Sequence, residues 1–77
     1  MNVTIKYFGL LAEITDCDEE IMEFNYTLIS EVLDILYIKY PTLKGKDFQV
    51  AQNNNLVSIE TKLTATEIAL LPPFSGG

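Results

Sequence analysis

The sequence contains no histidine and no arginine, and its only cysteine is Cys17. With no histidine and one cysteine, the chain lacks the usual ligands of a zinc site and the Ser-His or Cys-His pair of a self-sufficient hydrolase. A single cysteine cannot form an internal disulfide, so nothing indicates an oxidising compartment and we expect a cytoplasmic protein. Cys17 lies in the acidic stretch 16–20, where neighbouring carboxylates disfavour a reactive thiolate.

Basic residues are scarce as well, because five lysines stand against eleven aspartates and glutamates, for a formal net charge of −6. This charge opposes binding to a phosphate backbone, so we expect no nucleic-acid partner. No apolar stretch approaches the length that spans a bilayer, and the first residues lack the basic and apolar regions of a signal peptide. We therefore expect no membrane partner.

The composition is sufficient for one small folded domain. The chain is 48% hydrophobic and 21% charged, so it has enough apolar side chains to fold. With 77 residues it is too short to form two hydrophobic cores. We find no repeat and no linker, so the prediction is a single domain over residues 1–77.

In the first half of the chain, the apolar residues recur first at the spacing of a strand and then at the spacing of a helix. Residues 2–8 alternate apolar and polar side chains, which predicts a strand, and residues 10–16 predict a short helical turn. Residues 21–26 predict a second strand that forms a hairpin with the first. A longer helix is predicted to begin after Thr27 as its N-cap and to end before Pro41. Its apolar stripe comprises Ile29, Val32, Leu33, Leu36, Tyr37 and Tyr40.

The second half reads as short strands over residues 48–52, 56–60 and 66–71, with a turn at the three asparagines 53–55. The order of elements is strand, strand, helix, then two or three strands. It predicts an α+β fold of the β-grasp (ubiquitin-like) kind, a mixed sheet of four to five strands with one main helix packed on one face. The other face must meet water or a partner.

Three large apolar residues interrupt the polar side of the predicted strands. Phe8 shares a face with Thr4 and Lys6, and Leu56 and Leu71 also fall on sides that the alternation marks as solvent-facing. One exposed hydrophobe means little, but three on one sheet face would form a protein-binding patch. We predict that Phe8, Leu56 and Leu71 form such a patch near the C-terminal tail.

The sequence ends Leu-Pro-Pro-Phe-Ser-Gly-Gly, and residues 72–77 are predicted to protrude as a flexible tail. Pro72 and Pro73 cannot extend the sheet and form a stiff stalk. Gly76 and Gly77 can enter a channel only as wide as a backbone. The carboxylate at the tip becomes reactive once a partner enzyme links it to AMP as a mixed anhydride.

This ending resembles the C-terminus of the MoaD family, the small sulfur-carrier subunit of molybdopterin synthase, and the opening "VTIKYFGLLAEI" resembles that family's first strand and helix. The resemblance covers the whole chain. It implies that an E1-like adenylyltransferase uses ATP and Mg to form a glycyl adenylate at Gly77, which sulfur from a persulfide source converts into a thiocarboxylate. The sulfur then attacks precursor Z, cyclic pyranopterin monophosphate, and two deliveries build the molybdopterin dithiolene.

The same resemblance implies partners and roles for the tail. The carrier docks on the large catalytic subunit, in a heterotetramer of two small and two large subunits, and holds no catalytic pocket or bound cofactor itself. The threaded part comprises Pro72, Pro73, Phe74, Ser75 and Gly76, and the patch of Phe8, Leu56 and Leu71 meets both partners. One departure is the turn 64–66, Thr-Ala-Thr, where the family commonly has an Asp-Gly-Asp type of turn.

Three alternatives remain open at this point. A carrier for another pathway, such as that of thiamine, would use the same terminal chemistry with a different acceptor. A protein modifier would end with Gly77 in an isopeptide bond to a lysine. A binding module with an inert tail is the third alternative.

Overall fold

The structure is a computed structural model that describes residues 1–25 and 27–73. Five strands and two α-helices follow one another along the chain, with a short 3-10 helix (η1) after the second α-helix. Their bounds are β1 (Asn2–Tyr7), α1 (Leu10–Thr15), β2 (Glu19–Glu23), α2 (Ile29–Lys39), η1 (Pro41–Gly45), β3 (Gln49–Gln52), β4 (Asn55–Val57) and β5 (Glu67–Leu71).

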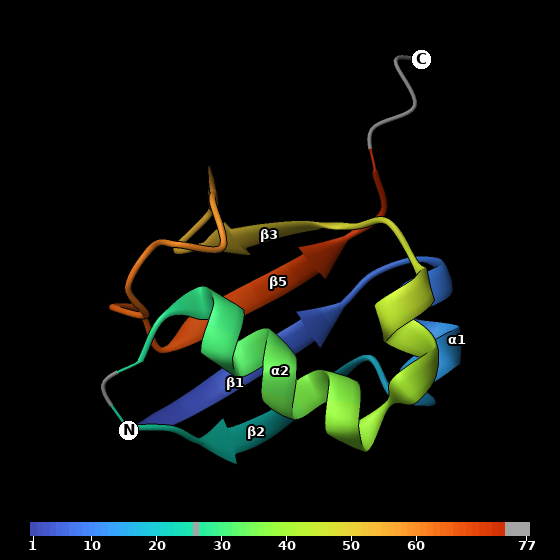
Figure 1. The fold of residues 1–77 in the computed structure, drawn as a ribbon, viewed down its shortest axis with the longest axis horizontal. Helices are drawn as coiled ribbons and strands as arrows, with labels where there is room; N and C mark the ends of the chain where they lie inside the picture. Colours follow the sequence, from blue (N-terminus) through green and yellow to red (C-terminus); the bar gives the residue numbers. More distant parts are fainter. Residues whose placement is uncertain (26, 74–77) are drawn as a thin grey trace.

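The strands form one mixed sheet in the order β2-β1-β5-β3-β4. β1 and β5 run parallel beside each other, and the other neighbouring pairs are antiparallel. Figure 1 shows α2 crossing one face of this sheet, with α1 at the end where β1 and β5 finish. The predicted α+β fold, a mixed sheet with one main helix, is confirmed.

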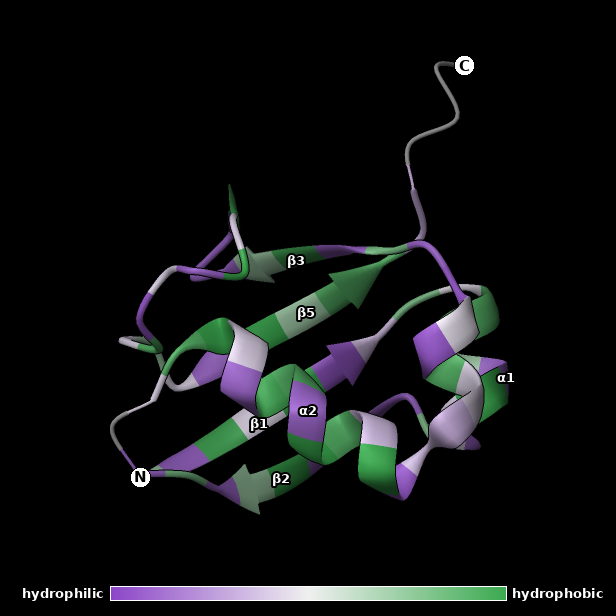
Figure 2. Ribbon diagram, in the orientation of Figure 1, coloured by the Kyte–Doolittle hydropathy of each residue, from purple (hydrophilic) through white to green (hydrophobic). Residues whose placement is uncertain are grey.

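The core lies between α2 and the sheet, and the sequence periodicity explains it. Alternate residues of β1 and β5 are buried, as are the four residues of α2 that recur at helical spacing. Figure 2 shows hydrophobic residues along the strands and an alternation of hydrophobic and hydrophilic residues around α2. The buried residues of these three elements are Val3, Ile5, Tyr7, Ile68, Leu70, Ile29, Val32, Leu33 and Leu36.

The second strand begins earlier than predicted. β2 covers Glu19–Glu23 rather than residues 21–26, so two glutamates of the predicted acidic loop belong to the strand. Pairing with β1 explains the shift, because Glu19 and Glu20 lie opposite Lys6 and Ile5 in the ladder. The strands pair antiparallel as predicted, and α1 lies in the connection between them.

The N-cap of α2 is Leu28, and the prediction of Thr27 was wrong by one residue. Leu28 keeps an extended backbone because it forms a bridge with Lys62, so the helix cannot begin earlier. The Glu31 carboxylate accepts a hydrogen bond of 2.8 Å from the Leu28 N–H, which satisfies one of the free donors at the helix start. The hydrogen bond lowers the pKa of Glu31.

The asparagine turn is confirmed, since Asn53 and Asn54 adopt positive φ values of 54° and 68°. β4 ends at Val57, earlier than predicted, because the chain turns at Ser58, whose carbonyl accepts from the Thr61 N–H at 3.1 Å. The 3-10 helix η1 has no counterpart among the predicted elements.

A buried glutamine holds the loop before β5. Gln52 donates from Nε2 to the Lys62 carbonyl at 3.0 Å, and its Oε1 accepts from the N–H groups of Thr64 and Ala65 at 2.8 and 3.3 Å. The Gln52 amide therefore fixes the backbone of residues 62–65 before β5.

Candidate functional site

The C-terminal tail leaves the sheet from the end of β5, beside the turn that follows β1. The Phe8 N–H donates to the Leu70 carbonyl at 3.2 Å, which continues the parallel pairing past the end of β1. Pro72 then packs against Gly9, whose φ is +60° and where an added Cβ would lie 2.8 Å from the Pro72 Cγ. Only glycine accepts this backbone conformation and this approach without strain. The first tail residue is thus seated on the β1–α1 turn.

The structure describes only the first two of the predicted tail residues. Pro72 and Pro73 are exposed and follow β5 directly. The predicted functional residues Phe74, Ser75, Gly76 and Gly77 lie outside the described residues. Figure 1 shows the chain leaving the sheet at the end of β5, away from the N-terminus.

The three predicted patch residues lie on the sheet face that α2 does not cover. Phe8 is 45% exposed and adjoins the half-buried Leu71, because Tyr7 pairs with Leu70 in the parallel ladder. Leu56 is 62% exposed and lies two strands away from β5, on β4. Two strand spacings correspond to roughly 10 Å, so Phe8 and Leu71 are neighbours and Leu56 is the outlying member.

Small residues connect the outlying leucine with the other two. Ala51 of β3 pairs with Leu56 on one side and with Ala69 of β5 on the other, so both alanines lie between Leu56 and Leu71 on the same face. Ala51, Ala69 and Gly9 were not among the predicted site residues. The alternation put Ala69 on the face of Leu71, but a small side chain does not indicate whether that face is open. A close approach such as that of Gly9 has no sequence signature.

The rim of this face is charged. Lys6 lies 3.3 Å from Glu67, and the pair crosses from β1 to β5 on the open face. A hollow of about 470 Å³ adjoins Phe8 and is lined by Lys6, Tyr7, Phe8, Gly9, Ala12, Asp18 and Glu19. The face therefore combines apolar residues with an acidic border, which suits a partner surface that is apolar at its centre and basic at its edge.

A cluster around Glu20 fixes the end of β1 from which Phe8 emerges. The hydroxyls of Tyr7 and Tyr40 both donate to Glu20 Oε2, at 2.7 and 2.5 Å, and Lys39 Nζ bonds to Oε1. Tyr7 and Tyr40 also contact each other edge to face, with ring centroids 6.1 Å apart. The cluster ties the C-terminal end of α2 to β1 and β2.

The ionisation of these groups follows from their contacts. Burial acts to raise the pKa of Glu20, but the hydrogen bonds from Lys39, Tyr40 and Tyr7 outweigh it and lower that pKa. Burial and the bond to Glu20 raise the pKa of Tyr7, and they raise the pKa of Tyr40 to about 12. At neutral pH the cluster is thus a carboxylate held by two neutral phenols and an ammonium, which is a structural arrangement and not an acid–base pair.

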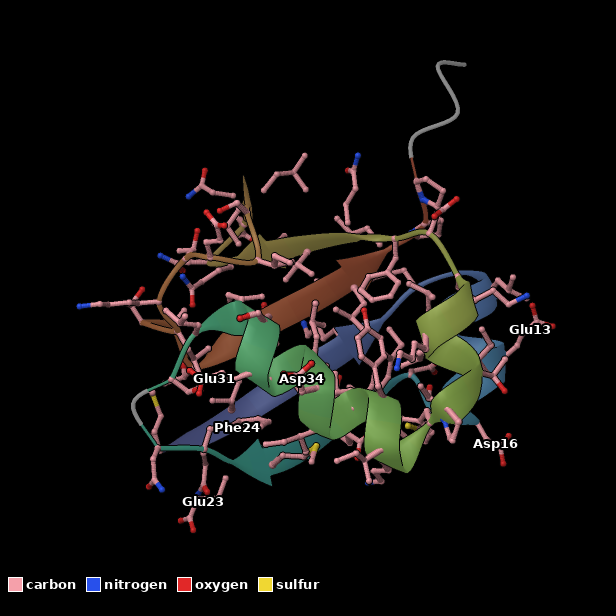
Figure 3. The ribbon with its side chains drawn as sticks, in the orientation of Figure 1. Glu13, Asp16, Glu23, Phe24, Glu31 and Asp34 are labelled. Carbon is pink, nitrogen blue, oxygen red and sulfur yellow. The ribbon has the colours of Figure 1, made fainter. Side chains whose placement is uncertain are left out.

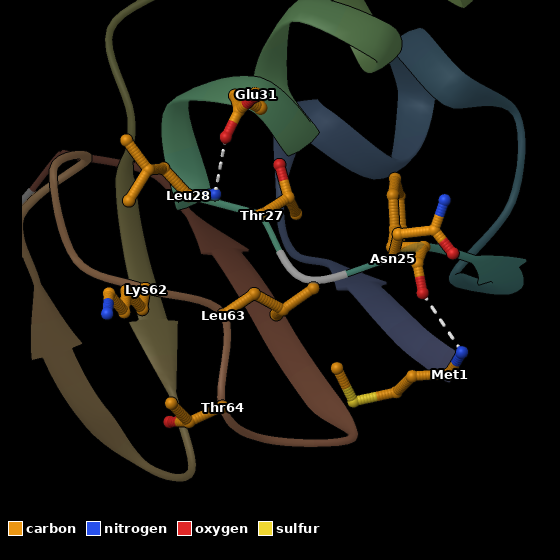
Figure 4. Close-up of a pocket in the computed structure, with 9 residues that line it drawn as sticks. Met1, Asn25, Thr27, Leu28, Glu31, Lys62, Leu63 and Thr64 are labelled. Atoms are coloured by element: carbon orange, nitrogen blue, oxygen red, sulfur yellow. Dashed lines mark hydrogen bonds between the residues drawn. The ribbon is translucent and has the colours of Figure 1, made fainter.

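Another hollow, of about 860 Å³, is lined by residues that include Met1, Phe24, Leu28, Glu31 and Leu63 (Figure 4). Its polar contacts are the helix cap between Leu28 and Glu31 and the bond from the Met1 ammonium to the Phe24 carbonyl, 2.9 Å long. These contacts satisfy the ends of α2 and β1 and leave no pair of reactive groups. We assign no chemistry to this hollow.

Within residues 1–25 and 27–73, no group of three side chains of the metal-binding types is placed to hold an ion. None of the helices described is both long and apolar enough to cross a membrane. Cys17 is half-buried, and its Sγ lies 3.9 Å from Glu20 Oε2.

The sequence of residues 5–77 matches the model of the ThiS family. The chain belongs to the ThiS family. It is a small protein with the β-grasp fold of the ThiS and MoaD type. The predicted relationship to the sulfur carriers is confirmed at this level.

Several solved structures share this fold. A Pyrococcus furiosus protein named as a candidate molybdopterin converting factor, subunit 1, has a TM-score of 0.87 at 20% identity, and the match covers 95% of this chain and 98% of that one. SAMP1 of Haloferax volcanii has a TM-score of 0.81 at 22% identity, with full coverage of both chains. The small archaeal modifier protein 1 of Methanosarcina acetivorans has a TM-score of 0.75 at 28% identity, with coverage of 99% and 96%.

Proposed function

We propose that the protein is the sulfur carrier of a molybdopterin synthase. In this role the C-terminal carboxylate of Gly77 reacts with Mg-ATP on an E1-like enzyme, which releases pyrophosphate and leaves a glycyl adenylate. The terminal sulfur of a persulfide then attacks the adenylate and displaces AMP, which forms an acyl disulfide. A thiol reduces the S–S bond of this acyl disulfide and leaves a thiocarboxylate at Gly77. The thiocarboxylate donates its sulfur to precursor Z on a large catalytic subunit.

The observation that carries the proposal is the position of the chain's exit from the sheet. β5 ends at Leu71, Pro72 rests on Gly9, and the chain leaves beside the exposed Phe8. A partner that covers Phe8 and Leu71 is therefore in place to receive the residues that follow Pro72. The sequence of those residues, Pro-Phe-Ser-Gly-Gly, suits a narrow channel in that partner.

The chemistry of the described residues is consistent with a carrier that supplies no catalytic groups. In the Glu20 cluster, the two tyrosine hydroxyls form hydrogen bonds with the carboxylate. With a net charge of −6, the chain favours partners with basic docking surfaces. We propose two such partners, the E1-like adenylyltransferase and the large subunit, in a heterotetramer of two small and two large chains.

A second candidate function is protein modification. The Haloferax volcanii and Methanosarcina acetivorans proteins that share this fold are both called small archaeal modifier proteins. The same adenylate at Gly77 would then pass to the amine of a lysine and form an isopeptide bond. Activation is common to the two functions, and they differ in the acceptor.

The direct experiment uses changes at the tip of the tail. A variant with one alanine added after Gly77 and a variant that lacks Gly77 are each combined with the E1-like enzyme, Mg-ATP, a persulfide source, the large subunit and precursor Z. We expect both variants to keep the fold and to form no molybdopterin, whereas the natural sequence forms it. Molybdopterin formation by either variant would refute the proposal.

The docking face is tested by the substitutions Phe8→Asp and Leu71→Asp. Both should weaken binding to the large subunit by tenfold or more while changing the melting temperature little, since a charge cannot be buried against an apolar partner surface without cost. Ile38→Asp is the matched control, because Ile38 is 82% exposed on α2, the other layer of the molecule. Equal loss of binding in all three variants, or a large loss of stability at position 71, would contradict the assignment of this face.

A further inference from the structure

β2 forms one edge of the sheet, and among the described residues it pairs only with β1. Figure 1 shows β2 at the border of the sheet, away from the end of β5. An edge strand offers its outward N–H and C=O groups to any extended chain that lies alongside it. The edge therefore offers backbone groups that the face around Phe8 and Leu71 does not, and Glu19 borders both surfaces.

Hydrogen bonds at the ends of the ladder determine which backbone groups of β2 are turned outward. Met1 and Phe24 exchange bonds in both directions, at 2.9 and 2.8 Å, and the Tyr7 N–H donates to the Asp18 carbonyl at 2.8 Å. In an antiparallel ladder such bonded pairs alternate with unbonded pairs. The even-numbered residues of β2 are therefore bonded to β1, and the odd-numbered residues point their N–H and C=O groups away from the sheet.

The three outward residues are Glu19, Ile21 and Glu23, and their side chains share one face by alternation. All three are exposed, and Ile21 is 69% exposed. Figure 3 shows Glu23 directed away from the sheet at this edge. Among the residues that the structure describes, neither glutamate lies within ion-pair distance of a lysine.

We propose that this edge binds an extended segment of a partner protein that adds to the sheet as a sixth strand. The segment would have a basic residue, any residue, an apolar residue, any residue and a basic residue in succession. Its apolar residue lies opposite Ile21, and its two basic residues lie opposite Glu19 and Glu23. Cross-strand pairs of opposite charge and of apolar residues both favour this register.

The other face of the added strand would also find an apolar neighbour. Met22 of β2 is half-buried on the side of α2, and Ile35 of α2 is 43% exposed. Ile35 lies one helical turn before Lys39, which bonds to Glu20 of β2, so it occupies the side of α2 that faces this edge. An apolar residue at one of the two unspecified positions would pack there.

A second copy of this chain is a poor occupant of the edge. Antiparallel pairing of two β2 strands about Ile21 would place Glu19 of each copy opposite Glu23 of the other, and like charges directly opposite are destabilising. Both copies also carry a net charge of −6. The charges thus select a basic partner segment over self-association.

The test uses a backbone-cyclised hairpin peptide, because a pre-formed strand loses little entropy on binding. One strand of the peptide carries Lys-Thr-Ile-Thr-Lys, and a matched peptide carries Glu-Thr-Ile-Thr-Glu. The full-length protein is labelled with ¹⁵N, and amide exchange and chemical shifts are followed by NMR during each titration. We expect slower exchange at the amides of Glu19, Ile21 and Glu23, and little change at Glu20 and Met22, which are already bonded to β1.

Charge variants of the protein complete the test. The lysine peptide should bind about tenfold more tightly than the glutamate peptide, and Glu19→Lys with Glu23→Lys should reverse that preference. The control variant, Glu13→Lys with Asp34→Lys, changes the net charge by the same amount, but on α1 and α2. It should still prefer the lysine peptide. The proposal is overturned by binding that ignores the peptide's charge, by protection without alternation along β2, by protection at Phe8 and Leu71 instead, or by a dimer of this chain that uses β2.

Discussion

Removing the Glu20 carboxylate should cost more stability than removing any other acidic side chain of the described residues. The side chain of Glu20 is only 14% exposed, and its carboxylate accepts hydrogen bonds from the hydroxyls of Tyr7 and Tyr40. A hydrogen bond to a charged group contributes about 1.5–3 kcal/mol, and water can reach part of this site. For Glu20→Ala we therefore expect the free energy of unfolding to fall by about 2–4 kcal/mol.

The magnitude is large for a domain of this size. Native domains are stable by roughly 0.05–0.15 kcal/mol per residue, so the loss is a substantial share of the total. Denaturant unfolding followed by circular dichroism measures it, with Glu19→Ala as the control because Glu19 is exposed on the same strand. The control should change the unfolding free energy by less than about 0.5 kcal/mol. Equal effects of the two substitutions would refute the account of the cluster.

The same cluster predicts a pH dependence. Because the folded protein lowers the pKa of Glu20, the carboxylate stabilises the fold fully above its unfolded pKa of about 4.3. That contribution is lost as the pH falls through the lower, folded value. The stability difference between the natural protein and Glu20→Gln should be constant near neutral pH and shrink in acid. A difference that grows as the pH falls would contradict the direction of the shift.

Two further substitutions test the loop and the seat of the tail. Gln52→Leu should lower the unfolding free energy by about 2 kcal/mol, because it removes three hydrogen bonds from the loop before β5; an unchanged denaturation midpoint would show that water replaces them. Gly9→Ala should cost about 1–3 kcal/mol and shift the NMR signals of Pro72, whereas Gly45→Ala, with nothing within 4 Å of its added Cβ, should be nearly neutral. Similar effects of the two alanines would rule out a tight seat at Gly9.

Much of the fold followed from local patterns in the sequence. The spacing of Ile29, Val32 and Leu36 predicted α2, and the alternation in residues 2–8 and 66–71 predicted the two central strands. These elements carry a strong period because each buries one continuous face. The limits of β2 and the cap of α2 could not be read locally, since they depend on pairing with β1 and with Lys62.

The candidate site was predictable to a similar extent. Phe8 and Leu71 stood out because each is a large apolar residue on a polar side of its strand. Ala51 and Ala69 did not, because a small residue looks the same on a buried or an open face. The seat of Pro72 on Gly9 joins residues that are far apart in the chain, so only the folded structure shows it.

The most direct test of the central claim is the intact mass of the protein after reaction with the E1-like enzyme, Mg-ATP and a persulfide source. We expect a mass gain equal to the replacement of one oxygen by sulfur, located at Gly77 by fragmentation and absent from a variant that lacks this residue. An unchanged mass, with the same enzymes active on a known carrier, would contradict the carrier function. A mass gain in the variant without Gly77 would contradict the assigned site.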